Sequence, residues 1–146
     1  MKKGIIIGSD HGGFPLKELL RPVLEELSFS VTDAGCYNTT SVNYPEIGKK
    51  VSESIASDEF PRGILICGTG IGMSIIANRF QKVRATLCND HLAAKLSRQH
   101  NNSNILVLGA RVLGIETAID ILNTWLNTDF DGGRHLERIE MFDQNH

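Results

Sequence analysis

Short apolar runs alternate with amphipathic stretches along the chain. The apolar runs are rich in Ile, Val and Leu, which is typical of buried strands, whereas the stretches between them repeat apolar residues three and four positions apart, as helices do. The predicted strands cover 4–9, 28–35, 62–67, 83–88 and 104–109. The predicted helices cover 14–27, 47–56, 72–80, 90–100 and 115–126, and a polar, charged tail follows them.

This alternation favours βαβ crossovers, and a sheet covered on both faces explains strands that are apolar almost throughout. The pattern therefore predicts an α/β protein: a three-layer α/β/α Rossmann-like sandwich with a five-stranded parallel sheet. The run 28–35 carries polar residues between its apolar ones, so we expect this strand near an edge of the sheet. Pro22 is expected to kink or divide the first helix.

Length, charge and cysteine content narrow the class of protein. The chain has 146 residues, 41% of them hydrophobic, so we expect one domain over 1–146 with a C-terminal tail segment from about 130 to 146. Its 15 basic and 17 acidic residues are interspersed, which gives no overall charge for a nucleic acid or a membrane surface. No apolar segment is long enough for a signal peptide or a membrane span, which indicates a cytoplasmic protein.

Two glycine-rich turns follow predicted strands. The turn Ser-Asp-His-Gly-Gly (9–13) follows the first strand, and Cys-Gly-Thr-Gly-Ile-Gly (67–72) follows the third. Ligands of such sheets bind outside the carboxyl ends of the strands, and the N–H groups that open the following helices form anion sites. Two such turns at neighbouring strand ends indicate a small, negatively charged ligand.

Two other interpretations of these glycines remain open. Each glycine by itself is explained by a tight turn between a strand and a helix. Gly68, Gly70 and Gly72 also resemble part of a dinucleotide-binding fingerprint, with Asp90 at the distance of a ribose-binding acid, although the third glycine comes one residue early. Neither turn contains the GxxxxGK[ST] pattern of a P-loop.

Cys67 is the candidate for proton or nucleophile chemistry. Cysteines are commonly buried as small hydrophobic residues, but a thiol just before a glycine loop and a helix N-terminus lies in a field that favours the thiolate. Cys36 and Cys88 lack such a loop, and we expect both to be structural. All three are expected to be free thiols, because the sequence contains no CxxC pair.

Polar residues elsewhere could complete such a site. Asp10 and His11 follow the first strand, where they serve either as a helix cap or as proton donors and acceptors. His100 and Asn101 end a predicted helix, where the dipole alone favours a histidine. Taken in isolation, these four residues would not identify the protein as an enzyme.

Arginines near the C-terminus form a further candidate. Arg134 and Arg138 are four residues apart and share one face of a helix, which suits a phosphate or a carboxylate. A solvated charged face is the more common explanation, since Glu137 and Glu140 lie beside them. Arg111, after the fifth strand, is a third candidate.

Six motifs in this order resemble the ribose-5-phosphate isomerase B and galactose-6-phosphate isomerase family. The resemblance covers nearly the whole chain. The motifs are SDHGG (9–13), NYPE (43–46), ICGTGIGMSIIANR (66–79), LSRQHNN (96–102), LGARVLG (108–114) and GGRHLER (132–138).

The resemblance implies an isomerisation through an enediolate, without metal or organic cofactor. Cys67 would be the base that takes the C2 proton, while Thr69 and the loop amides would hold the developing oxyanion. One branch of the family uses a glutamate on the loop as base; that position is Met73 here, which places this sequence in the cysteine branch.

The resemblance also implies roles for the other residues. His100, aided by Asp10, would open the sugar ring. The binding residues would be His11, Arg111, Arg134 and Arg138 for the phosphate, Tyr44 and Asn101 for the sugar, and Gly68, Gly70, Gly72 and Ser74 on the glycine loop.

Members of the family are dimers, some of which associate further, so the resemblance implies a homodimer or tetramer with shared active sites. The expected reaction interconverts ribose 5-phosphate and ribulose 5-phosphate. Allose 6-phosphate, galactose 6-phosphate and unphosphorylated sugars remain as alternative substrates. From a different class, a non-catalytic module that binds a nucleotide, NAD or a sugar phosphate would use the same loops.

Overall fold

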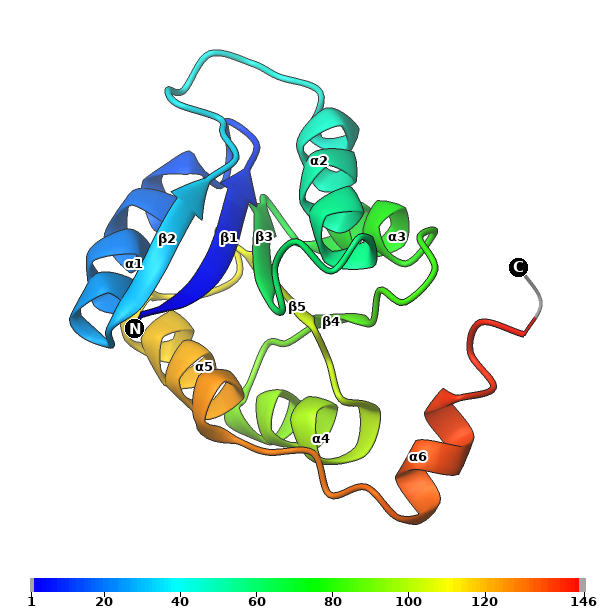
Figure 1. Ribbon diagram of the computed structural model, residues 1–146. Helices are drawn as coiled ribbons and strands as arrows, with labels where there is room; N and C mark the ends of the chain where they lie inside the picture. Colours follow the sequence, from blue (N-terminus) through cyan, green and yellow to red (C-terminus); the bar gives the residue numbers. More distant parts are fainter. Residues whose placement is uncertain (1, 145–146) are drawn as a thin grey trace.

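The computed structural model describes residues 2–144; Met1 and residues 145–146 of the expected tail lie outside them. Its five strands form one parallel sheet in the order β2-β1-β3-β5-β4 (Figure 1). The strands are β1 (Lys3–Ser9), β2 (Phe29–Asp33), β3 (Gly63–Cys67), β4 (Ala85–Leu87) and β5 (Ile105–Gly109). The helices are α1 (Phe14–Glu26), α2 (Tyr44–Ala56), α3 (Ile71–Ala77), α4 (His91–Asn101), α5 (Ile115–Asn127) and α6 (Arg134–Ile139).

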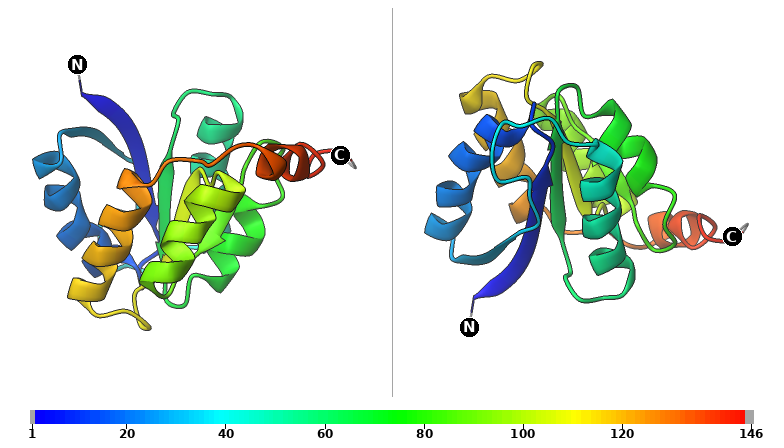
Figure 2. Two further views of the ribbon diagram at one scale, coloured as in Figure 1. Left: turned by 90° about the horizontal axis from the view of Figure 1, so that it is seen from below. Right: turned by 90° about the horizontal axis from the view of Figure 1, so that it is seen from above.

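Helices cover both faces of the sheet, which confirms the three-layer prediction (Figure 2). Side chains of a strand alternate between faces. On β3, Ile64 and Ile66 pack with α1, α4 and α5, whereas Leu65 and Cys67 pack with α2 and α3. The strand β2 lies at an edge, as its polar positions predicted.

The direction of the strands fixes where polar loops meet. Because all strands are parallel, the loops after β1, β3 and β5 emerge at the same carboxyl edge. The helix α4 starts beyond the carboxyl end of β4 and runs back to the opposite edge, where β5 begins. Residues at the start of a helix and residues at its end therefore lie at different edges of the sheet.

Two helices differ from their predicted form. The helix α2 begins at Tyr44, earlier than expected, because Pro45 in the first turn favours a helix start. The helix α1 continues through Pro22 without division. Pro22 is exposed while Leu20 and Leu24 are fully buried, so packing on the sheet holds the helix together across the missing hydrogen bond.

The tail forms the short helix α6, which projects from the body of the molecule (Figures 1 and 2). None of its residues is buried. Leu136 is 45% exposed, and Phe142 just beyond the helix is 48% exposed. Within residues 2–144, no helix is long and apolar enough to cross a membrane.

A buried lysine ties α1 to the end of β2. Lys17 has no exposed surface, and its ammonium lies 2.6 Å from a carboxylate oxygen of Asp33 and donates to the carbonyl oxygen of Cys36. The rings of Phe14 and Tyr37 lie 5.3 and 5.4 Å from the same nitrogen. The ion pair and these rings offset the cost of burying the charge.

Candidate active site

A hollow of about 270 Å³ lies at the carboxyl edge of the sheet, where the loops after β1, β3 and β5 meet the start of α2. Most of its lining was expected at one site from the sequence. The lining residues are Asp10, His11, Gly12, Tyr44, Cys67, Gly68, Thr69, Gly72 and Arg111.

Cys67 is the last residue of β3 and is held firmly at the hollow. Its side chain packs with α2 and α3 and is 5% exposed. The N–H of Gly70 donates to Sγ at 3.2 Å, and the carbonyl oxygen of Cys67 accepts from the N–H of Ala110 at 2.9 Å. A donated N–H stabilises negative charge that forms on the sulfur.

Backbone conformation and close packing require glycine at two positions of the loop. Gly70 has a φ of +81°, in the left-handed region that side chains avoid. A Cβ on Gly72 would lie 2.5 Å from the ring of Tyr44, so the missing side chain lets that ring close over the loop. The same glycines that shape the turn thus bring Tyr44 into the hollow.

Asp10 and His11 take defined orientations. Asp10 is buried, and one carboxylate oxygen accepts from the N–H of Gly13, the residue before α1, at 2.8 Å. The other oxygen accepts no hydrogen bond from residues 2–144. Nδ1 of His11 accepts from the N–H of Val42 at 3.2 Å, so the proton of the neutral ring lies on Nε2, where it can be donated.

Arg111 contacts Gly68, and Thr69 follows Gly68 in the chain. The N–H of Arg111 donates to the carbonyl oxygen of Gly68 at 2.9 Å, and a Cβ on Gly68 would lie 3.5 Å from Cδ of Arg111. The hydroxyl of Thr69 accepts from the N–H of Ile71 at 3.3 Å and keeps its own proton for another acceptor. Ser74, expected on the same loop, lies on α3 and does not line the hollow.

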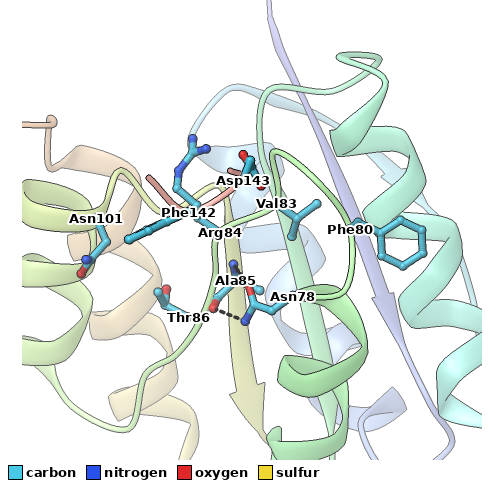
Figure 3. A pocket seen from close by; sticks show the side chains of 9 residues that line it. All are labelled: Asn78, Phe80, Val83, Arg84, Ala85, Thr86, Asn101, Phe142 and Asp143. Atoms are coloured by element: carbon cyan, nitrogen blue, oxygen red, sulfur yellow. Dashed lines mark hydrogen bonds between the residues drawn. The ribbon is translucent and has the colours of Figure 1, made fainter. Parts of the chain in front are cut away.

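The remaining predicted residues lie in a second group at the opposite edge. His100 and Asn101 end α4, and Arg134 and Arg138 lie on α6. Asn101 lines another hollow, of about 300 Å³, together with Phe142 of the tail (Figure 3). One chain therefore does not bring His100 or the tail arginines to Cys67.

The second group contains a pair of histidines. The rings of His100 and His135 stack with their centroids 4.3 Å apart. Partial burial and the positive charges of His100, Arg134 and Arg138 lower the pKa of His135, and Asp131 opposes this shift. The group therefore combines two imidazole rings with the carboxylate of Asp131, the kinds of side chain that bind metal ions.

Two cysteines and Asp90 have structural roles outside the candidate site. Cys36 and Cys88 are buried free thiols, as expected, and burial raises the pKa of Cys88. Asp90, the acid of the dinucleotide interpretation, is the N-cap of α4 and accepts from the N–H of Ala93 at 2.7 Å. That carboxylate is thus committed to the helix.

Sequence reasoning missed three residues around the two groups. Gly12 lines the first hollow, and the N–H of Val42 sets the tautomer of His11. His135 lies between the two tail arginines in the motif GGRHLER, and this position could have identified it from the sequence. The contact of Val42 crosses a long loop and leaves no pattern in the sequence.

The chain is similar to known proteins over most of its length. Residues 5–142 match the model of the ribose/galactose isomerase family. The chain is 44% identical to ribose-5-phosphate isomerase B of Escherichia coli K12 over 140 residues, 96% of this chain and 93% of that protein. It is 38% identical to a D-erythrulose-4-phosphate isomerase of Pectobacterium atrosepticum, over 93% and 90% of the two chains. The solved structure of a ribose 5-phosphate isomerase from Thermotoga maritima is 49% identical, matches with a TM-score of 0.95, and covers 99% of both chains.

Proposed function

The chain belongs to the ribose/galactose isomerase family, and from this premise we propose that it interconverts ribose 5-phosphate and ribulose 5-phosphate. The single observation that carries this proposal is the position of Cys67, a thiol fixed at a polar hollow in a chain 44% identical to a ribose-5-phosphate isomerase B. The expected sugar-phosphate contacts His11, Tyr44 and Arg111 line the same hollow.

Cys67 acts as the base of the proposed reaction. Its thiolate takes the proton from C2 of the open-chain aldose, and the electrons of that C–H bond move to form an enediolate. The thiol then gives the proton to C1 while the proton of the C2 hydroxyl moves to O1, which gives the ketose and regenerates the thiolate. The N–H of Gly70, 3.2 Å from the sulfur, stabilises the charge before and after each transfer.

Hydrogen-bond donors of the glycine loop stabilise the enediolate. The Thr69 hydroxyl is one donor, and the N–H of Gly72, in the first turn of α3 where amides have no partner within the helix, is another. Each preorganised donor of this kind contributes about 3–4 kcal/mol in the transition state. The donors lie beside Cys67, so the charge they stabilise is the one that its proton transfer creates.

The phosphate binds between His11 and Arg111. Nε2 of His11 donates one hydrogen bond, and the exposed guanidinium of Arg111 beside Gly68 supplies charge and further donors. These two residues come from loops after different strands, β1 and β5, at the same edge. Both residues line the same hollow as Cys67, which supports binding of the phosphate and of the reacting carbons in one site.

A second copy of the chain completes the site. We propose a homodimer in which the partner contributes His100 to open the sugar ring, Asn101 to bind the sugar, and Arg134 and Arg138 to bind the phosphate. This follows from the division of the expected residues between opposite edges of one chain. The projecting helix α6, which buries none of its residues within its own chain, supports it.

Parallel assays of ketose formation test the proposed substrate. The purified protein is given ribose 5-phosphate, allose 6-phosphate, galactose 6-phosphate and erythrose 4-phosphate, the last because a 38% identical relative is named for a four-carbon sugar phosphate. We expect the highest kcat/KM for ribose 5-phosphate. A higher value for another sugar would reassign the substrate within the family, and turnover of none would favour a binding module, for which a shift of Tm with NAD is the next test.

A further inference from the structure

His100, Asp131 and His135 form a cluster that the isomerase reaction does not fully use. Each residue offers one ligand atom, and these atoms all lie within 4.8 Å of one another. They come from two segments: His100 lies at the end of α4, Asp131 lies before α6, and His135 lies in the first turn of α6. The proposed reaction assigns a role to His100 alone, which leaves Asp131 and His135 without one.

The backbone holds the two segments of this cluster together. The N–H of Asp131 donates to the carbonyl oxygen of Gln99 at 3.0 Å, directly beside His100. The N–H of His135 donates to the carbonyl oxygen of Gly132 at 3.1 Å, which closes the turn between the carboxylate and the second imidazole. These main-chain hydrogen bonds hold the backbone of the three residues together, and their side chains are neighbours for that reason.

The chemistry of the three ligands suits Zn²⁺. Imidazole nitrogen and carboxylate oxygen bind zinc at about 2.0–2.2 Å, and two histidines with one carboxylate leave a fourth position for water. His100 and His135 are half-buried and Asp131 is exposed, so both rings have room to rotate out of their stack and turn a nitrogen towards one ion.

Positive charge from Arg134 and Arg138 opposes a cation here. Both side chains are exposed, so they can turn into solvent, where their charges are screened. The carboxylate of Asp131 offsets part of the remaining repulsion.

We propose that His100, Asp131 and His135 form an inhibitory zinc site. Zinc on His100 removes the imidazole that would open the sugar ring, so the inhibition rests on the proposed function, whereas the binding does not. The ion and the substrate would compete for the same histidine.

Equilibrium dialysis with Zn²⁺ tests the binding. The full-length protein is first treated with EDTA and desalted. We expect one ion per chain, with affinity at least tenfold lower in Asp131→Asn and in His135→Gln. His91→Gln is the matched control, because His91 forms another exposed pair with a carboxylate, Asp120, at 3.1 Å; it should bind zinc as the wild type does. Equal affinity in all four proteins would overturn the proposal.

Co²⁺ distinguishes this site from a thiol site. Cobalt bound by two imidazoles and a carboxylate gives no thiolate charge-transfer band, and Cys67→Ser leaves its affinity unchanged. A thiolate band that disappears in Cys67→Ser would assign the ion to Cys67 and overturn the proposal.

Turnover of ribose 5-phosphate tests the inhibition. We expect zinc to slow the wild type, EDTA to restore it, and Asp131→Asn to need at least tenfold more zinc for the same inhibition. Zinc binding with no turnover of any sugar would contradict the proposed function alone. Turnover without zinc binding that depends on Asp131 and His135 would contradict this inference alone.

Discussion

Arg134 lies on the exposed helix α6. In the proposed dimer, it contacts the substrate bound in the site of the partner subunit. Replacing it by alanine should raise KM for ribose 5-phosphate by roughly ten- to 150-fold, because one charge-assisted contact to the phosphate is worth about 1.5–3 kcal/mol. The change in kcat should be small, since the phosphate does not react. Steady-state kinetics measure both constants, and an unchanged KM would show that Arg134 is a surface residue without a role in binding.

His100 should matter only for a sugar that closes into a ring. Erythrose 4-phosphate has its O4 esterified and cannot form a furanose, so it needs no ring opening. In His100→Asn we expect kcat/KM for ribose 5-phosphate to fall by about 10²–10⁴-fold, the usual contribution of a general acid or base. The value for erythrose 4-phosphate should fall far less. An equal loss for both sugars would assign His100 to another step.

Candidate site residues could be predicted from the sequence where they directly follow a recognisable strand. Cys67, Asp10, His11 and Arg111 each follow a strand, and strand ends are recognisable from the apolar runs before them. Lys17 could not be predicted as buried, because a lysine on an amphipathic helix is normally a polar surface position. Its partner Asp33 belongs to another element, and no local pattern joins the two.

The glycine loop between β3 and α3 requires a left-handed residue at Gly70. Gly70→Ala should destabilise the protein by at least about 1–2 kcal/mol, because of the strained φ, and should lower turnover, because the Gly70 N–H holds Cys67 Sγ. Its new methyl group would also lie 2.5 Å from the side chain of Leu87. Thermal unfolding and ketose assays measure the two effects.

Gly114→Ala is the matched control for this substitution. Gly114 has an ordinary φ of -74°, and a Cβ there would have nothing within 4 Å. We expect it to change stability by less than about 1 kcal/mol and to leave turnover intact. Similar losses in both variants would show that the left-handed turn at Gly70 is not what holds the loop.

The elements themselves were largely predictable. Five apolar runs became the five strands, since a sheet covered on both faces buries its strands almost completely. Boundaries were less certain: the run 83–88 forms a strand only over Ala85–Leu87. The start of α2 at Tyr44 was missed because its first turn is polar and shows no helical periodicity, although Pro45 marks it.

Division of the expected site between opposite edges is a property of the whole fold that no motif reveals. The six motifs were read in order along the chain, but the crossover through α4 carries His100 away from Cys67. The family resemblance implied shared sites, and the division of the expected residues between two edges supports that prediction. A second copy is the simplest way to join the two groups.

Mixing two inactive variants tests this sharing. Cys67→Ala and His100→Asn each disable every site of their own dimers. In a mixed dimer, one site receives both substitutions and the other receives neither. After unfolding and refolding together, we expect about one quarter of the wild-type activity, because half of the dimers are mixed and each has one intact site.

An inactive mixture would contradict the shared site. If one chain formed a complete site, the mixture would be as inactive as its components. Separately refolded samples of each variant, combined afterwards, are the control for incomplete exchange of subunits. Light scattering of the same samples measures the oligomeric state directly.

The central claim, an isomerase whose base is Cys67, is tested most directly by ketose formation from ribose 5-phosphate without added metal. We compare the wild type, Cys67→Ala and, as the matched cysteine control, Cys88→Ala, whose thiol is buried away from the hollow. The account predicts turnover by the wild type and Cys88→Ala, and a kcat lower by about 10³-fold or more in Cys67→Ala with substrate binding largely kept. Near-normal turnover by Cys67→Ala would contradict it, because another group would then be moving the proton.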